Sequence, residues 1–265
     1  MNDTDSISIQ SKGIVRTRLH EKVYGNLEKK IITIVAPAGY GKSTLLSQFL
    51  CESKKNHAII RIPEASNFIF QSFIKYFINS LSNCEHCSGL VFQKTKEFLA
   101  GSQSGDSDKT DLIIDSVQII LSEMEPKLNS SFYIAFDDIQ YLNNPEWLED
   151  FIKYFCDFSG VRIKLILSSR SELPFNLIGF KSKRELFSMT ISDLKFDLRE
   201  IEELAVGIYD IKLSDKELNF LNKKFEGWIT GLPLFLQEYD SSNKAGVDDH
   251  KITDFVYEYF AEIVF

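Results

Sequence analysis

The sequence predicts an α/β fold in which a mostly parallel sheet of five strands is followed by a small helical domain. Short apolar runs rich in β-branched residues predict the strands, at 31–35, 58–62, 132–136, 162–168 and 188–191. Helical patterns lie between these runs, and alternation of strands with helices is typical of parallel sheets. After about residue 196 the patterns are helical only, which predicts a second domain there.

Helices of the first domain are predicted from apolar residues at helical spacing, near 17–28 and at 43–51, 67–82 and 111–124. The stripe of Phe and Ile side chains at 67–82 is interpreted as core rather than as a cofactor pocket. Polar residues at 101–110 predict a loop. Asn144 and Pro145 predict another helix start, because Pro suits the first helical turn.

Helix boundaries in the second domain have local signals. Two pairs have the spacing of an N-cap residue and its acidic partner, Asp197 with Glu200 and Ser214 with Glu217. Glycine favours the left-handed conformation beyond a helix C-terminus, so helix ends are expected at Gly207 and Gly227.

The charge balance limits the class of partner. The 265 residues carry a formal net charge of −8, and the sequence pI is about 5.2. Nucleic-acid backbones are bound by Lys and Arg, so this balance argues against a broad nucleic-acid-binding face. The polar segment 1–12 is predicted to be flexible and has no apolar signal region, and no apolar run reaches the ~20 residues of a membrane span. These features predict a cytoplasmic protein with no membrane partner.

Four cysteines are present, Cys51, Cys84, Cys87 and Cys156. Cys84 and Cys87 flank His86 at a spacing found in metal sites, but no second Cys or His pair completes four ligands. The preferred interpretation is a surface loop with reduced thiols, which fits the cytosol.

A phosphate-binding P-loop is predicted between the first strand and the following helix, in the segment APAGYGKST at 36–44. Its backbone N–H groups would surround phosphate oxygens at the positive end of the helix. The predicted nucleotide-binding residues of this loop are Ala38, Gly39, Tyr40, Gly41, Lys42, Ser43 and Thr44. The alternative is a chance match on a strand–turn–helix.

Each P-loop residue type has a physical role. Gly39 and Gly41 permit the tight backbone path. Lys42 would reach the β- and γ-phosphates, and the Ser43 hydroxyl would be a Mg²⁺ ligand. Thr44 would contact a phosphate through its side chain or N–H.

Polar residues follow two later strands, where α/β sheets bind ligands. Asp137 would hold Mg²⁺ through water, and Asp138 could position or deprotonate the attacking water. Arg170 ends the fourth strand and could contact the γ-phosphate. The predicted catalytic residues are therefore Lys42, Asp137, Asp138 and Arg170. The alternatives are solvated acids at a strand end and an ordinary surface arginine.

Five segments occur in order along the chain: VRTRL at 15–19, the P-loop with Tyr40, FDD at 136–138, SSR at 168–170 and GWITGLPL at 227–234. Together they resemble the corresponding segments of the STAND signal-transduction ATPases, and most closely those of the MalT-type, large LuxR family of transcriptional activators. The resemblance covers roughly 13–265. The residues around Tyr40 and the GWITGLPL segment are the most specific parts of the resemblance.

The resemblance implies a domain order and further site residues. A P-loop nucleotide-binding domain at 13–196, with the sensor strand between the two motif strands, would precede a helical domain at 197–240. A linker at 241–250 and the start of a truncated winged-helix domain at 251–265 would follow. Pro233 would pack against the adenine or its sugar, and Val15 and Arg16 would border the adenine. A helix start is the alternative for each of these positions.

The resemblance also implies an ATP/ADP-binding switch with slow, Mg²⁺-dependent hydrolysis. Such proteins rest as ADP-bound monomers, and inducer with ATP lets them self-associate and activate transcription. Inducer sensing and the DNA-binding helix-turn-helix would belong to C-terminal domains absent from this chain. Alternatives are a DNA-handling or remodelling ATPase with fast turnover, which would need a basic channel, and a small-molecule kinase, for which no acceptor-binding motif is seen.

Overall fold

The computed structural model of the chain describes residues 14–52, 55–64, 68–87, 89–102, 109–143, 146–173, 175–228 and 230–238. The expected N-terminal segment (1–12), linker (241–250) and final helix (251–265) lie outside the described residues, as do Asn144 and Pro145. The chain divides into two compact units. The sheet unit contains 18–38 and 45–193, and the helical unit contains the described residues of 1–17, 39–44 and 194–265.

The sheet unit is built on five parallel strands, β1 (Ile31–Val35), β2 (Asn56–Arg61), β3 (Phe132–Asp137), β4 (Ile163–Ser169) and β5 (Leu186–Met189). Their order is β2-β3-β4-β1-β5. The predicted five-stranded parallel sheet is confirmed, and β4 lies between β1 and β3 as the resemblance implies. Because the strands are parallel, all their carboxyl ends meet at one edge of the sheet.

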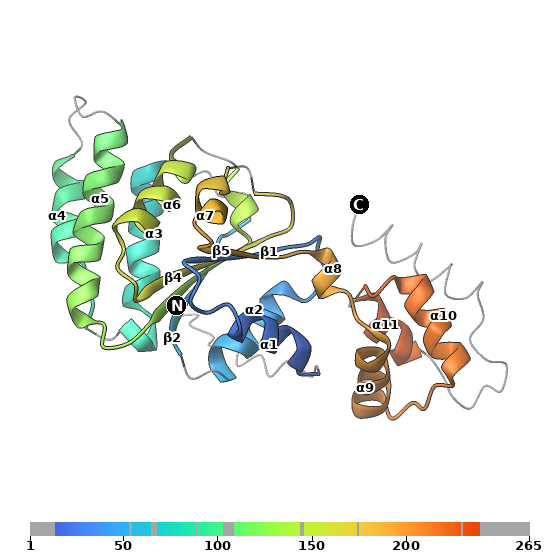
Figure 1. Cartoon of the computed structure of the whole chain (residues 1–265). Coiled ribbons are helices and arrows are strands. Elements are labelled where there is room, and N and C mark those ends of the chain that lie inside the picture. The colour runs from blue at the N-terminus through green and yellow to red at the C-terminus, as the bar shows by residue number, and fades with distance from the viewer. Residues whose placement is uncertain are drawn as a thin grey trace. The chain divides into compact units, whose positions relative to one another are not determined.

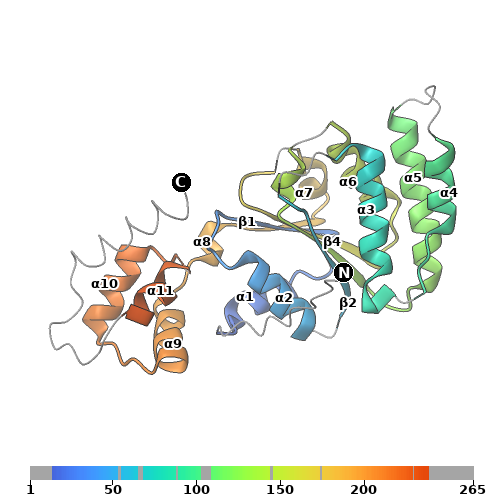
Figure 2. The ribbon, with the colours of Figure 1, turned by 180° about the vertical axis from the view of Figure 1, so that it is seen from behind.

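Helices cover both faces of this sheet (Figures 1 and 2). One face carries α3 (Phe70–Ser82), α5 (Lys109–Met124) and α6 (Glu146–Phe158), with α4 (Gln93–Gly101) against α5. The other face carries α1 (Thr17–Tyr24) and α2 (Lys42–Glu52). The aromatic rings of Tyr24 and Phe49 join these two helices edge to face, with centroids 5.0 Å apart.

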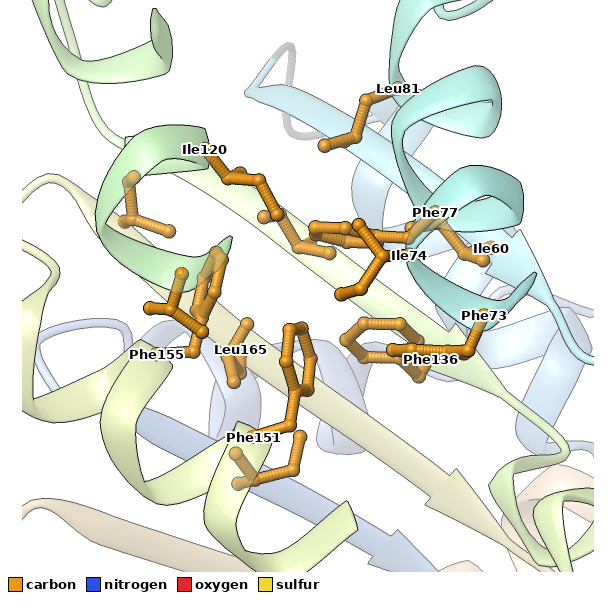
Figure 3. Packing of buried hydrophobic residues seen from close by; sticks show 14 of the residues in the cluster. Ile60, Phe73, Ile74, Phe77, Leu81, Ile120, Phe136, Phe151, Phe155 and Leu165 are labelled. Atoms are coloured by element: carbon orange, nitrogen blue, oxygen red, sulfur yellow. The ribbon is translucent and has the colours of Figure 1, made fainter. Parts of the chain in front are cut away.

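Aromatic side chains fill the layer between the sheet and its helices (Figure 3). Phe77 from α3 stacks on Phe136 from β3, with centroids 5.6 Å apart, and meets Phe151 from α6 edge to face at 5.7 Å. All three side chains are at most 1% exposed. The helical Phe stripe is therefore core, as predicted, and it fixes α3 and α6 on the strand that ends at Asp137.

Some boundaries differ from the sequence prediction. The fifth strand ends at Met189, because the Thr190 amide donates to Asp193 Oδ2 at 2.9 Å and opens the short helix α8 (Ile191–Leu194). Helix α1 ends at Tyr24, before position 28. Helix α4 was not predicted, since only Thr95 and Leu99 are buried along it. The remaining short elements of the sheet unit are η1 (Glu85–Cys87), η2 (Glu125–Lys127), η3 (Ile139–Leu142) and α7 (Ile178–Ser182).

The helical unit contains α9 (Leu198–Tyr209), α10 (Asp215–Phe225) and α11 (Gly231–Glu238). Both predicted N-caps are confirmed as full capping boxes, Asp197 with Glu200 and Ser214 with Glu217. Gly227 follows α10 with φ +72°, as predicted. The prediction for Gly207 was wrong. It lies inside α9, which ends instead at Asp210, a left-handed residue whose N–H donates to the Ala205 carbonyl.

Candidate nucleotide-binding site

The predicted phosphate loop leaves β1 at the carboxyl edge of the sheet. The Ala36 amide donates to the Ser169 carbonyl at 3.2 Å, which ties the start of the loop to β4. Gly39 and Gly41 both have positive φ, +82° and +74°. Lys42 then begins α2 with its side chain buried. Two glycines in the left-handed region before a helix N-terminus give the backbone path that a phosphate cradle needs.

Gly39 is held by the segment that precedes α11. Thr230 donates both its amide and its hydroxyl to the Gly39 carbonyl oxygen, each at 3.1 Å. A Cβ on Gly39 would lie 2.7 Å from Thr230 Oγ1 and closer still to the Trp228 indole nitrogen. The P-loop and the GWITGLPL segment therefore meet within the helical unit, through residues that are 191 positions apart in the sequence.

Tyr40, the other specific residue of the loop, packs into the same unit. Its side chain is partly buried against the helical core, which includes Phe225, Trp228 and Leu232. Burial raises the pKa of the Tyr40 phenol, and the nearby Glu226 carboxylate raises it further. The phenol is thus neutral at physiological pH and anchors the loop as an aromatic side chain.

Two buried polar side chains lie at the carboxyl edge of the sheet. Asp137 ends β3, and Ser168 lies beside it on β4, one position beyond the paired residues Phe136 and Leu167. Asp137 is 2% exposed and Ser168 is fully buried. Within the described part of the chain, Asp137 Oδ1 and Ser168 Oγ have no hydrogen-bond partner. A buried carboxylate oxygen normally has a partner, so Asp137 fits the predicted role of a ligand to hydrated Mg²⁺.

Asp138 and Arg170 form an ion pair at this edge. Arg170 Nε lies 3.0 Å from Asp138 Oδ1, and this hydrogen bond raises the pKa of the guanidinium. Asp138 adopts the left-handed conformation, with φ 57°, which turns the chain sharply after β3. The guanidinium also lies 5.2 Å from the centroid of the Tyr141 ring. The two predicted site residues are thus brought together.

Gln140 links both members of the pair and was missed by the sequence reasoning. Its amide nitrogen donates to Asp138 Oδ1 at 2.8 Å, and its amide oxygen accepts from the Arg170 backbone N–H at 2.9 Å. The only sequence signal was its position three residues after Asp137. A single Gln in a turn has no diagnostic pattern, so this contact could be found only in three dimensions.

The residues expected near the adenine lie in different surroundings. Arg16 is buried and donates to both carboxylate oxygens of Glu200, at 3.0 and 2.8 Å, and to the Lys195 carbonyl at 2.9 Å. Val15 is 45% exposed. Pro233 is the third residue of α11, in the first helical turn, where a backbone N–H has no partner within the helix and proline is tolerated. Arg16 therefore has a structural role within the helical unit, whatever its relation to a base.

Comparison with known proteins finds MalT transcriptional regulators among the relatives of this chain. Over 223 residues the chain is 24% identical to the HTH-type transcriptional regulator MalT of Yersinia enterocolitica, covering 83% of this chain. Over 254 residues it is 22% identical to MalT of Klebsiella pneumoniae, covering 92% of this chain. The chain is similar to MalT-type regulators. The resemblance stated from the motifs is thus confirmed, although the matched part spans only 23% and 26% of those MalT sequences. No protein-family model matches the chain.

Solved structures support the fold. A STAND protein with a tetratricopeptide repeat sensor from Pyrococcus horikoshii matches with a TM-score of 0.60 and 16% identity, over 92% of this chain and 32% of its own. A Walker-type ATPase of Pyrococcus abyssi matches with a TM-score of 0.55 and 18% identity, over 94% of this chain and 73% of its own. The fold is therefore that of P-loop ATPases. Among the described helices, none has the length and apolar character needed to cross a membrane.

Proposed function

We propose that this chain is the ATP/ADP-binding switch module of a bacterial, signal-responsive transcriptional activator, with slow ATP hydrolysis. Similarity to MalT-type regulators over most of the chain supports the regulatory role. The P-loop ATPase fold and the paired acids after β3 support binding of a nucleotide with Mg²⁺. A protein of this kind responds to whether the γ-phosphate is present.

One observation carries the choice of a switch over a simple catalyst. Thr230 holds the Gly39 carbonyl, so the loop that would bind phosphates is part of the compact unit formed by the following helices. A change in the Gly39 backbone on nucleotide binding would alter its two hydrogen bonds to Thr230. That gives nucleotide occupancy a direct route to the helices that follow.

The roles proposed for individual residues follow from their chemistry. Lys42 and the loop amides from Ala38 to Thr44 bind the phosphates, and Ser43 with Asp137 holds Mg²⁺. The cation neutralises charge on the β- and γ-phosphates when bound. Asp138 orients or deprotonates water, and Arg170 senses the γ-phosphate. Pro233 packs against the adenine or its sugar, and Val15 borders the adenine. Arg16 positions the segment that carries Val15.

The remaining partners are proposed from the relatives. The MalT proteins are HTH-type transcriptional regulators of about four times the matched length. We propose that inducer binding and DNA binding belong to regions that this chain does not include, and that activation involves self-association. The proposed domain order, with a nucleotide-binding domain at 13–196 and helices at 197–240, follows from the resemblance of the motifs to STAND ATPases.

The first test is the identity of the nucleotide that co-purifies with the chain. We expect tightly held ADP, and turnover of ATP far below the median enzyme rate of ~10 s⁻¹. Lys42→Ala should abolish nucleotide binding, with Lys75→Ala, on the exposed side of α3, as a control. Normal ATP binding by the Lys42→Ala variant would refute the site, and turnover near the enzyme median would favour the fast, DNA-handling alternative.

A further inference from the structure

Cys84 and Cys87 close one turn of 3₁₀ helix after α3. The Cys87 amide donates to the Cys84 carbonyl at 3.0 Å, and η1 spans Glu85–Cys87. In a 3₁₀ turn the side chains at i and i+3 eclipse, and the corresponding Cα atoms are about 6 Å apart. That separation lies in the range that disulfides bridge, about 4.4–6.8 Å. The surface loop expected here is therefore a structured turn, with Cys87 3% exposed in the core and Cys84 half-buried.

The two sulfurs have different environments. The Cys84 thiol donates to the His57 carbonyl of β2 at 2.8 Å. The Cys87 thiol, with the His86 amide and imidazole, lowers the pKa of Cys84 to about 6. The interaction with Cys84 and burial both raise the pKa of Cys87. A half-buried sulfur with a lowered pKa next to a buried sulfur with a raised pKa is the arrangement found at redox-active thiol pairs.

We propose that Cys84 and Cys87 form a thiol–disulfide exchange site, with Cys84 attacking low-molecular-weight disulfides of the glutathione type. The Cys84 thiolate attacks one sulfur of the small disulfide, a mixed disulfide forms, and one thiolate leaves. Cys87 then gives up its proton and attacks the Cys84 sulfur, and the second small thiolate leaves. Two protein thiols are oxidised to a disulfide, and one small disulfide is reduced to two thiols.

A metal site at the same place is less well supported. Within the described residues, no group of three or more His, Cys, Asp or Glu side chains is arranged to hold a metal ion. His57 and His86 lie nearby, but their rings face each other with centroids 4.7 Å apart, and His57 Nδ1 is bonded to the Lys55 carbonyl. The dithiol is thus the reactive unit.

Oxidation would change a contact at the edge of the sheet. The hydrogen bond from Cys84 to the His57 carbonyl exists only in the thiol form, so ionisation to the attacking thiolate and disulfide formation both remove this link between the turn after α3 and the edge strand β2. His57 lies at the amino end of β2, whereas the P-loop follows the carboxyl end of β1. The exchange site therefore lies at the amino ends of the strands, whereas the proposed nucleotide site lies at their carboxyl ends. The exchange site does not depend on the nucleotide site.

The test exposes the reduced chain to buffers with set ratios of reduced to oxidised glutathione, followed by alkylation and mass spectrometry of the peptides. We expect a Cys84–Cys87 disulfide, seen as the loss of two hydrogens. In Cys87→Ser, and in Cys87→Ala as a second variant, glutathione should stay attached to Cys84. In Cys84→Ser, Cys87 should stay reduced. Cys51→Ser should behave like the wild type.

Two results would overturn the proposal. One is the absence of a Cys84–Cys87 disulfide at every glutathione ratio in a chain whose circular dichroism shows it folded. The other is slower alkylation of Cys84 than of the exposed Cys51 in the reduced wild-type chain. Cys156 is an internal control, because burial raises its pKa to about 12 and should keep it unmodified.

Discussion

Arg170 pairs with Asp138 in this structure, with Nε 3.0 Å from Oδ1 and Nη2 3.5 Å from Oδ2. The Arg170 side chain is 43% exposed and that of Asp138 is 23% exposed. Ion pairs with this exposure contribute about 1 kcal/mol or less to folding. The pair can therefore open at small cost when another anion competes for the guanidinium, which is the property a γ-phosphate sensor requires.

Arg170→Ala should reduce the preference for ATP over ADP. Loss of one charge-assisted contact to the γ-phosphate should weaken ATP binding about tenfold, or ~1.4 kcal/mol, while ADP binding is little changed. Calorimetric titration with each nucleotide measures the ratio. Arg199→Ala, which removes an exposed arginine of α9, is the control. Equal losses for ATP and ADP would show that Arg170 supports the fold of the site rather than sensing the γ-phosphate.

Gly39→Ala tests the phosphate loop directly. The residue has φ +82°, where a Cβ costs about 1–2 kcal/mol, and the added carbon would collide with Thr230 and Trp228. We expect a lower thermal midpoint and at least tenfold weaker nucleotide binding. Gly179→Ala is the matched control, since an added Cβ there meets nothing within 4 Å. Unchanged nucleotide affinity in Gly39→Ala would mean that the loop does not need this backbone conformation.

The fold was predictable because its signals are local or periodic. The β-branched runs predict the strands, and the Phe stripe predicts the buried face of α3. Glycine spacing and a following helix predict the P-loop. The predictions were wrong where a single side chain determines the end of a strand or helix. Asp193 captures the Thr190 amide and ends β5 early, and Asp210 takes the left-handed turn that had been expected at Gly207.

The contacts within the candidate site were less predictable. Nothing in the sequence relates Thr230 to Gly39 or Gln140 to Arg170, because each contact joins segments that are separate along the chain. Arg16 was expected beside a base from its motif alone. Its bonding to Glu200 depends on how helix α9 packs, and no local pattern encodes that.

Thr230→Val should loosen the phosphate loop from the helical unit. The change keeps the amide bond to the Gly39 carbonyl but removes the hydroxyl bond, which contributes about 1 kcal/mol. If this contact couples the loop to the helices, ADP affinity should shift by about fivefold. Thr230→Ser, which keeps the hydroxyl, is the control. Identical behaviour of Val and Ser variants in nucleotide titration would argue against coupling through this bond.

Removing the cationic partner of Glu200 tests the structural role of Arg16. The Arg16–Glu200 pair is buried, each side chain being 8% exposed, and Glu200 also accepts from the Asp197 amide in the capping box of α9. Arg16→Met leaves the carboxylate buried without its cation, which should lower the free energy of unfolding by about 3–5 kcal/mol. Urea unfolding followed by Trp228 fluorescence measures it, in a Trp147→Phe background because the chain has two tryptophans.

A variant that replaces both members of the Arg16–Glu200 pair separates the effect of charge pairing from that of packing. In Arg16→Met/Glu200→Leu no charge is left unpaired, so much of the lost stability should return, since a hydrophobic replacement of a buried pair is often neutral. Glu203→Gln, on the exposed side of α9, is the control and should shift unfolding little. If Arg16→Met instead unfolds like the wild type but binds nucleotide poorly, Arg16 acts at the base, as the MalT-type resemblance implies.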